Sequence, residues 1–374
     1  MAKPYATPGV YVTEVSTLPP SVVQVPTAIP AFIGNVVSVF DDAGNVVNTP
    51  VFPIIRRITS IADYERYFGG PALLTGEVII KVDDKVKRNP INIFFKEMAL
   101  ESTAADAKLV KGISAARIHA LYYALQHFFA NGGGIAYVAA TSKTSPGLTD
   151  GTAQTIGDKA LKAVLDELEK VDEVTLLLAP EFAAATDYAT NAAQPLLAHA
   201  AKLGDRFALI DAPNSIKPND AGALSTWRSQ IIGTVDTLKY GAAYYPWLAT
   251  PLQAQPSADN VKVATEIDTI KIETGPDGKT TTTVVTTRLD EKSLSTFRNG
   301  AAGSQLEAQV LSIIAQQTLT LPPSAAIAGV YAQTDAARGV WKAPANVPLA
   351  AVNGPAIVVT AKQQEAFNVD AVSG

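Results

Sequence analysis

Strand and helix patterns alternate through the middle of the chain, and this alternation restricts the fold more than any other feature. Segments with the spacing of amphipathic helices separate apolar runs that have the length of buried strands. Strands that are apolar throughout are typical of a parallel sheet with helices on both faces. We therefore predict an α/β fold with a mostly parallel, helix-covered core. The predicted strands are residues 135–140, 174–180, 206–213 and 240–247.

The helix predicted before the first of these strands has the clearest pattern. In ARIHALYYALQHFFANGGG, residues 116–134, apolar side chains recur at helical spacing and predict one buried stripe: Ile118, Leu121, Tyr122, Leu125, Phe128 and Phe129. Asn131-Gly132 is an end signal for this helix. Further helices are predicted at 158–171, about 194–202, about 225–237, about 306–316 and about 325–337, the last ending at Gly339.

The segments outside this core differ from it in residue composition and hydrophobic pattern. YATPGVYVTEVSTLPP, residues 5–20, has β-forming residues between prolines and glycine, and so short a strand is not stable alone. A Thr-rich, charged and alternating segment at about 261–289, with a turn at 275–278, predicts a solvent-exposed β-hairpin. We predict three regions: an extended N-terminal arm (1–34), a central α/β domain that carries the hairpin (35–340), and the beginning of a C-terminal domain (341–374).

Composition argues against several classes of function. The net charge of −5 and the pI near 5.3 argue against nucleic acid as a partner. The chain has no Cys, which excludes disulfides, thiolate metal sites and cysteine nucleophiles. No apolar run is long enough to span a membrane, and the N-terminus lacks the pattern of a secretion signal. We expect no cofactor, no membrane insertion, and synthesis in the cytoplasm.

Few residues are candidates for chemistry. His119 and His127 lie on one predicted helix without a carboxylate at a spacing that would complete a metal site, so a structural role is favoured. Asp211 ends a predicted parallel strand, where α/β enzymes often keep catalytic groups, but pairing with Arg206 or capping of the following turn is favoured. No Gly-x-Ser-x-Gly elbow or phosphate-binding loop is present. We predict no catalytic, cofactor-binding or metal-binding residue.

Several sequence blocks together resemble contractile tail sheath proteins. The opening segment, residues 5–34, is similar to the N-terminus of that family. The later blocks occur in the family's order: ITSIADYERYFGG, FFANGGGIAYV, DRFALIDAP, YYPWL and AGVYAQTDAARGVWKAPAN. The similarity extends from Tyr5 to Asn346. The sequences PPSVVQVPTAIPAFIG and YFGGP are most similar to those of sheath subunits of extracellular phage-tail-like contractile injection systems.

The resemblance implies a structural, non-enzymatic subunit. Copies would form six-membered rings stacked helically around an inner tube protein, with baseplate and cap proteins as further partners. Contraction of this sheath would drive the tube through a target membrane. The family's core is subtilisin-like in fold, but no protease constellation is present here. Such a particle is assembled in the bacterial cytoplasm and functions after release.

The resemblance also gives the N-terminal arm a role. In sheath proteins this segment adds a strand to a neighbouring subunit's sheet, and its backbone donors and acceptors suit that role. Prolines stiffen the arm, and Pro19, Pro20 and Pro26 are candidate hinges. The residues expected in the exchanged strand are Val10, Tyr11, Val12, Thr13, Glu14 and Val15.

Other interpretations stay open at this point. One is a bacteriophage tail sheath proper, and another is a tail tube or baseplate component, which the block after Val330 argues against. The enzymatic alternative is an α/β hydrolase that uses Asp211 and His199, although its nucleophile motif is missing. Related sheaths continue further beyond their counterpart of residues 341–346 than residues 347–374 allow, so we expect this chain to be a truncated form of a longer protein.

Overall fold

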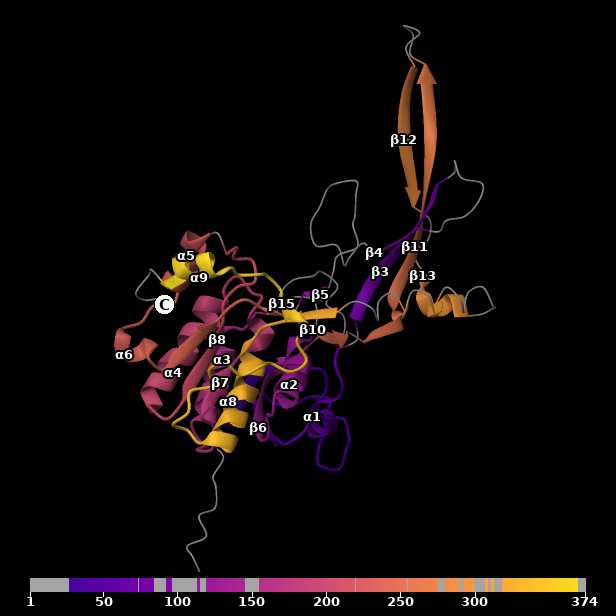
Figure 1. The fold of residues 1–374 in the computed structure, drawn as a ribbon. Coiled ribbons are helices and arrows are strands. Elements are labelled where there is room, and N and C mark those ends of the chain that lie inside the picture. The colour runs from indigo at the N-terminus through magenta and orange to yellow at the C-terminus, as the bar shows by residue number, and fades with distance from the viewer. Residues whose placement is uncertain are drawn as a thin grey trace, which may run out of the picture.

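A computed structural model shows a mixed α/β protein with a parallel-rich sheet at its centre (Figure 1). The predicted exchange strand, Val10–Val15, and the hinge candidates Pro19, Pro20 and Pro26 lie outside the described residues. Most of the helix predicted at 306–316 also lies outside them. The structure describes residues 27–72, 74–83, 92–95, 113–114, 119–144, 155–218, 220–253, 255–274, 280–288, 292–298, 307–308, 311–312 and 318–368.

The central sheet is parallel except at one edge. β1 pairs in parallel with β6 and β7, and the parallel pairing continues from β7 through β8 to β9. β2 closes one edge by pairing antiparallel to β6. The predicted parallel-rich α/β core is therefore confirmed. In spatial order the strands are β2 (Ile54–Ile58), β6 (Ala136–Lys143), β1 (Pro30–Val36), β7 (Leu176–Leu178), β8 (Phe207–Asp211) and β9 (Gly241–Tyr244).

Both faces of this sheet are covered. Every residue of β1 is buried, although successive side chains of a strand point to opposite faces. Phe32 meets Phe128 of α2 edge to face, with 5.3 Å between ring centroids. The neighbouring Ala31 and Ile33 are also fully buried, so a second layer covers the other face. The continuous apolar run of β1 is what such a two-sided environment requires.

The major helices belong to these covering layers. α2 packs against β1 and α8, whereas α4 contacts β7 and β8. α2 has buried residues all around its axis from Ala120 to Leu125, so the predicted single stripe was too narrow; a helix enclosed by a sheet and a second helix is apolar on every side. The helices are α1 (Ile61–Phe68), α2 (Ala120–Ala130), α3 (Asp158–Leu168), α4 (Gln194–Leu203) and α8 (Ser324–Arg338).

One predicted helix is divided in two. The segment predicted at 225–237 forms α5 (Ala221–Ser229) and α6 (Val235–Leu238) with a break between them. Asp220 caps α5 by accepting a hydrogen bond from the Ala223 N–H, and Gly233 lies in the break. The remaining short elements are α9 (Ala361–Asn368), the 3₁₀ helices η2 (Pro180–Phe182) and η4 (Leu294–Arg298), and the π-helical η3 (Ala189–Ala193).

A second sheet holds part of the chain's last described segment. Its strand order is β15 (Gly354–Pro355), β10 (Leu248–Gln253), β14 (Thr318–Leu321) and β5 (Ile113–Ser114). β15 pairs antiparallel with β10, and the Ala356 N–H adds a 2.7 Å hydrogen bond to the Trp247 carbonyl oxygen. The chain after α8 is therefore fastened to this sheet.

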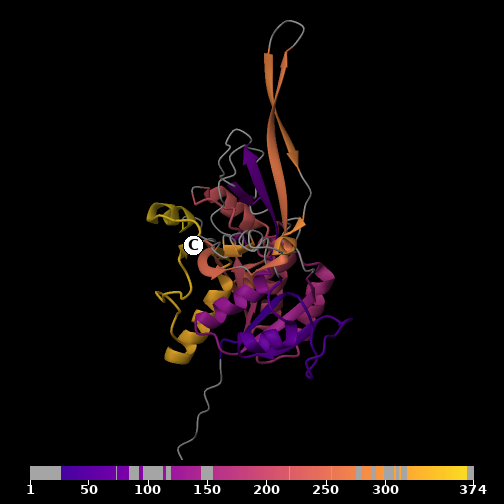
Figure 2. The same cartoon turned by 90° about the vertical axis from the view of Figure 1, so that its right-hand side faces the viewer.

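A third sheet contains the long strands that extend beyond the rest of the molecule in Figures 1 and 2. β11 pairs antiparallel with β12, but its residues Val261–Asp268 also pair in parallel with β3. The sequence did not indicate this second partner, because β3 and β11 are far apart in the chain. The strands are β3 (Leu74–Asp83), β4 (Asn92–Phe95), β11 (Pro256–Thr274), β12 (Thr280–Arg288) and β13 (Lys292–Ser293).

Candidate functional site

Asp211, the candidate catalytic acid, joins β8 to α8. Its Oδ1 accepts a 2.8 Å hydrogen bond from the Ser324 N–H, and its Oδ2 accepts a 2.7 Å bond from the Ser324 hydroxyl. The residue is fully buried, and this burial raises the pKa of its carboxyl to about 7. Ser324 is the first residue of α8, and its N–H has no partner within the helix. The Asp211 carboxylate satisfies this N–H and also complements the helix dipole. The predicted local partners, Arg206 and the following turn, were therefore wrong, while the structural role was right.

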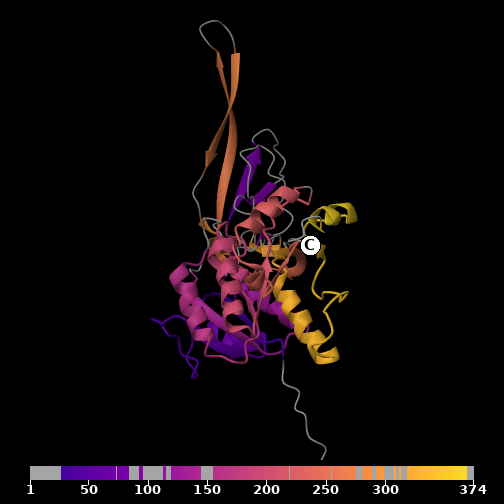
Figure 3. The same ribbon diagram turned by 90° about the vertical axis from the view of Figure 1, so that its left-hand side faces the viewer.

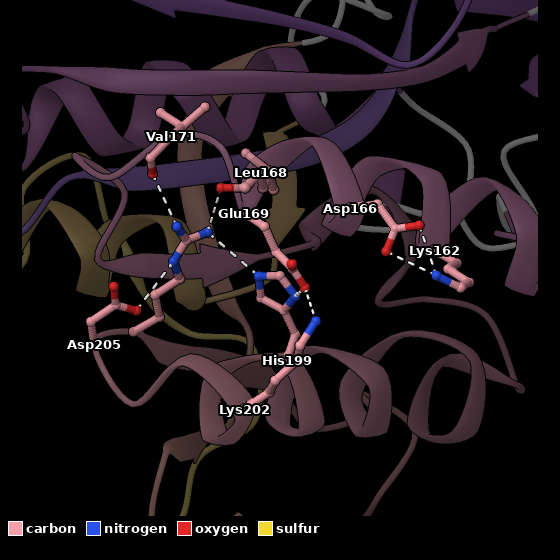
Figure 4. A network of polar contacts seen from close by, with 9 residues as sticks. Lys162, Asp166, Leu168, Glu169, Val171, His199, Lys202 and Asp205 are labelled. Carbon is pink, nitrogen blue, oxygen red and sulfur yellow. Dashed lines mark hydrogen bonds and ion pairs between the residues drawn. The ribbon is translucent and has the colours of Figure 1, made fainter.

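His199, the proposed partner of that acid, belongs to a different polar network (Figure 4). Its Nε2 lies 3.4 Å from Nη1 of Arg206, and its Nδ1 lies 3.9 Å from Oε1 of Glu169. Burial, and next the positive charge of Arg206, lower the pKa of His199. A neutral imidazole that accepts from Arg206 and points its other nitrogen at Glu169 fits this arrangement.

The same network fastens the end of α3. Arg206 is buried and donates to the carbonyl oxygens of Leu168 at 2.8 Å and Val171 at 3.0 Å. A guanidinium at a helix C-terminus satisfies carbonyls that have no partner in the helix and complements the helix dipole. Glu169 also pairs with Lys202 of α4. His199 and Asp211 thus serve separate structural connections, and the geometry does not bring them together as a catalytic pair.

The other two histidines bind backbone carbonyls. His119 places Nε2 2.7 Å from the Asn35 carbonyl oxygen, just before α2 rather than within it, and His127 places Nε2 3.2 Å from the Ala350 carbonyl oxygen. Burial lowers the pKa of each imidazole to about 4, so both are neutral at physiological pH. In the part of the chain that the structure describes, no group of three or more His, Asp or Glu side chains is arranged to hold a metal ion.

Glu181 is a buried acid that the sequence analysis missed. It follows β7, and its Oε2 accepts a 2.6 Å hydrogen bond from the Leu121 N–H in the first turn of α2. Burial raises the pKa of this carboxyl to about 8. The available signal was an acidic residue directly after the apolar run VTLLLAP, which resembles the position of Asp211 after β8. Like Asp211, Glu181 connects a strand end to a helix N-terminus.

Among the described residues, the surface exposes large apolar side chains at four places, three of which hold two such side chains each and the fourth of which is Val358 alone. The α8-end patch consists of Val340 and Trp341, and the β1–β2 loop patch consists of Val46 and Val51. The α5–α6 loop patch consists of Ile232 and Val235. Trp341 is 75% exposed and Val51 is 85% exposed. Contact between this apolar surface and water is unfavourable in free energy. Neighbouring exposed apolar side chains are candidate contacts with other macromolecules.

The charges beside these patches differ. Arg338 and Lys342 flank the α8-end patch, whereas Asp41 and Asp42 precede the β1–β2 loop patch. In the α5–α6 loop patch, Asp236 pairs with Lys239 at 3.1 Å. None of the helices in the described ranges is both long enough and apolar enough to cross a bilayer. The candidate functional region is the surface that carries these apolar patches and the charges beside them.

Comparison with known proteins gives structural neighbours. No protein-family model matches the chain, and no curated protein does. A structure of the anti-feeding prophage (AFP) helical sheath in the contracted state matches with 23% identity and a TM-score of 0.43, covering 97% of this chain and 62% of that chain. The contracted PVC sheath complex of an extracellular contractile injection system matches with 22% identity and a TM-score of 0.44, covering 98% and 61%.

A structure of the AFP baseplate matches with 22% identity and a TM-score of 0.42, again covering 97% of this chain and 62% of that chain. The present chain therefore spans about three fifths of the length of the chains it matches. At TM-scores below 0.5 the likeness does not assign a function, which has to be argued from the residues themselves.

Proposed function

We propose that this protein is a structural, non-enzymatic subunit of the contractile sheath of a phage-tail-like injection particle. One observation carries the proposal: sequence blocks that resemble sheath proteins, although far apart in the chain, pack against one another. A set of blocks that fits together physically is a stronger signature than the same blocks scattered over a fold.

Hydrogen bonds connect the later blocks. The Trp247 Nε1–H of YYPWL donates to the Ala212 carbonyl oxygen of DRFALIDAP at 2.8 Å. The hydroxyl groups of Tyr244 and Tyr331 lie 2.6 Å apart and join YYPWL to AGVYAQTDAARGVWKAPAN. Aromatic residues at these positions therefore form contacts within the chain.

Close packing and strand pairing connect the earlier blocks. A Cβ on Gly329 would come within 2.6 Å of the Phe128 carbonyl oxygen, so AGVYAQTDAARG needs Gly there to approach FFANGGG. Ile58 of ITSIADYERYFGG pairs with Ala136 of FFANGGGIAYV across β2 and β6. These contacts give a physical reason for the blocks to occur together.

The polar interior supports a structural role. Asp211, His199 and Glu181 are buried, and each hydrogen-bonds or faces groups that position strands and helices. A hydrolase would need at least one of them beside an accessible nucleophile. We therefore favour a sheath subunit over the α/β hydrolase alternative.

The finer features of the proposal follow the sequence resemblance. Copies form stacked rings of six around an inner tube, and baseplate and cap proteins terminate the stack. The core, subtilisin-like in the family, moves as a rigid body during contraction, while the arm at 1–34 keeps neighbours joined by strand exchange. The particle is assembled in the bacterial cytoplasm and functions after release, and a bacteriophage tail sheath is the nearest alternative.

Arm variants test the proposal. Deletion of residues 1–25, or Tyr11→Pro, removes backbone donors of the exchanged strand, and we expect a folded protein that no longer sediments as large assemblies. Ser21→Pro is a matched control, because it adds a proline beside Pro19-Pro20 and outside the strand. Circular dichroism checks the fold of each variant. Normal assembly by the deletion and by Tyr11→Pro would contradict strand exchange.

A further inference from the structure

We propose that the α8-end patch of one copy binds the β1–β2 loop patch of the next copy, so that copies join head to tail. This inference rests on the proposed function, because it names two surfaces through which sheath subunits would contact each other. It is independent of the N-terminal arm.

The α8-end patch is apolar, basic and firmly placed. α8 ends at Arg338, and Gly339 adopts φ +90°, which a residue with a side chain rarely adopts, so the chain turns sharply before Val340 and Trp341. Both apolar side chains remain mostly exposed beside Arg338 and Lys342. An exposed Trp next to cationic side chains is typical of an interface anchor.

The β1–β2 loop patch is apolar, acidic and ordered by its own hydrogen bonds. Asp41 accepts a 2.8 Å bond from the Asn45 N–H, and Phe40 and Val46 form a β-bridge. The hydrogen bonds from Asn45 lower the pKa of Asp41, so it is ionised at neutral pH. Val51 lies further along the same loop, and Asp42 is exposed. A preformed loop loses little conformational entropy on binding.

Charge selects between the possible partners of the α8-end patch. The β1–β2 loop patch has carboxylates that can pair with the Arg and Lys side chains of the α8-end patch. The carboxylate of the α5–α6 loop patch is already paired with Lys239. Opposite charges around two apolar patches favour one pairing and disfavour like-with-like contact.

The positions of the two patches require a contact between different copies. In Figure 2 the lower end of the yellow helix α8 lies on the left, and the indigo connection between β1 and β2 lies on the right; Figure 3 shows the reverse. Because the two surfaces lie on opposite flanks, one copy cannot bring them together. Contact between two different surfaces is heterologous, and it continues from copy to copy into a ring or a helix.

Engineered cysteines test this contact, because the natural chain has none. We expect the double variant Val340→Cys/Val51→Cys, concentrated under assembly conditions and oxidised, to give a ladder of covalent multimers. A disulfide requires Cα atoms within about 7 Å, so the ladder would report close approach. A mixture of the two single variants should stop at the dimer. The control Val340→Cys/Val235→Cys should remain monomeric.

A charge exchange gives an independent measurement. Lys342→Glu and Asp42→Lys should each lose assembly alone, and an equal mixture of the two should regain it, because every contact in the mixture can then pair opposite charges. Dimers from Val340→Cys alone would show a symmetric contact and overturn the proposal. If the wild-type chain never assembles, the proposed function fails; if it assembles but forms no ladder, only this inference fails.

Discussion

At the scale of single residues, the buried acids Glu181 and Asp211 hold helix N-termini against the ends of neighbouring parallel strands. The sequence placed Asp211 correctly at the end of a strand, because an acid after an apolar run is a local pattern. It could not indicate Ser324 as the partner, because that contact joins residues far apart in the chain. The burial that defines both acids depends in the same way on the packing of distant segments.

These two carboxyl groups should make stability depend on pH. The pKa of Glu181 is raised from 4.5 to about 8 and that of Asp211 from 3.8 to about 7, so the folded state keeps protons that the unfolded state releases between those values. The stability that these two groups contribute is therefore complete below about pH 4 and is lost as pH rises towards 7 to 8, by about 1.4 kcal/mol per pH unit for each group between its unfolded and folded pKa values. His119 and His127, whose pKa values are lowered to about 4, contribute the opposite slope below about pH 6.5. Urea unfolding at pH 6.5, 7 and 8 therefore measures the slope of the acids.

Glu181→Gln isolates one of the two contributions. Its amide oxygen can still accept from the Leu121 N–H but cannot ionise, so the slope should decrease by about 1.4 kcal/mol per pH unit. Asp172→Asn, at an exposed position, is the matched control and should leave the slope unchanged. An unchanged slope in Glu181→Gln would show that the acid is ionised in the folded protein.

At the scale of elements, local patterns predicted most helices and strands of the central sheet. α4 and α8 lie close to their predicted bounds. The errors have a common cause. α2 is buried all around, and β11 pairs with β3, because of neighbours that no local pattern contains. NGGG was interpreted only as the end of a helix, whereas Asn131 also holds the segment that follows α8.

Asn131→Ala should loosen the segment that follows α8 and contains Ala350. The Asn131 Oδ1 accepts from the Ala350 N–H at 2.7 Å, and its Nδ2 donates to the Ala350 carbonyl oxygen at 3.1 Å. Loss of both bonds should cost about 1–3 kcal/mol and expose the Ala350 amide to solvent. Hydrogen exchange at Ala350 should accelerate, while Asn48→Ala, at an exposed position, should leave it unchanged. Equal protection in Asn131→Ala would mean that other contacts hold the segment.

The far half of the β11–β12 pair should be dispensable for folding. In the described residues, Val261–Asp268 pair with β3, and Glu266–Asp268 also pair with β12, whereas Ile270 pairs with Val284 beyond the end of β3. Replacement of residues 270–284 by a short Gly/Ser turn should therefore leave the melting temperature close to that of the wild type. Replacement of all of 261–289 should lower the melting temperature, because β3 then loses most of its pairing with β11. Insoluble protein from the shorter replacement would contradict this division.

At the scale of the whole molecule, the polar groups discussed above are used to hold the fold together, and apolar groups are left on the surface. This distribution suits the proposed role as a subunit that binds other proteins. The sequence resemblance could indicate the kind of assembly, because its blocks specify contacts within one chain. The resemblance could not locate the exposed patches, because the exposure of Val340, Trp341 and Val51 depends on the three-dimensional structure.

Electron microscopy of the purified protein together with its inner tube protein tests the central claim most directly. A sheath subunit should polymerise into wide, ridged, hollow cylinders around the tube, and deletion of residues 1–25 should abolish them. Turnover on a panel of esters and peptides, measured on the same sample, should be absent. The account would be contradicted by a protein that stays dispersed at every concentration and hydrolyses one of these substrates in a reaction that His199→Ala abolishes.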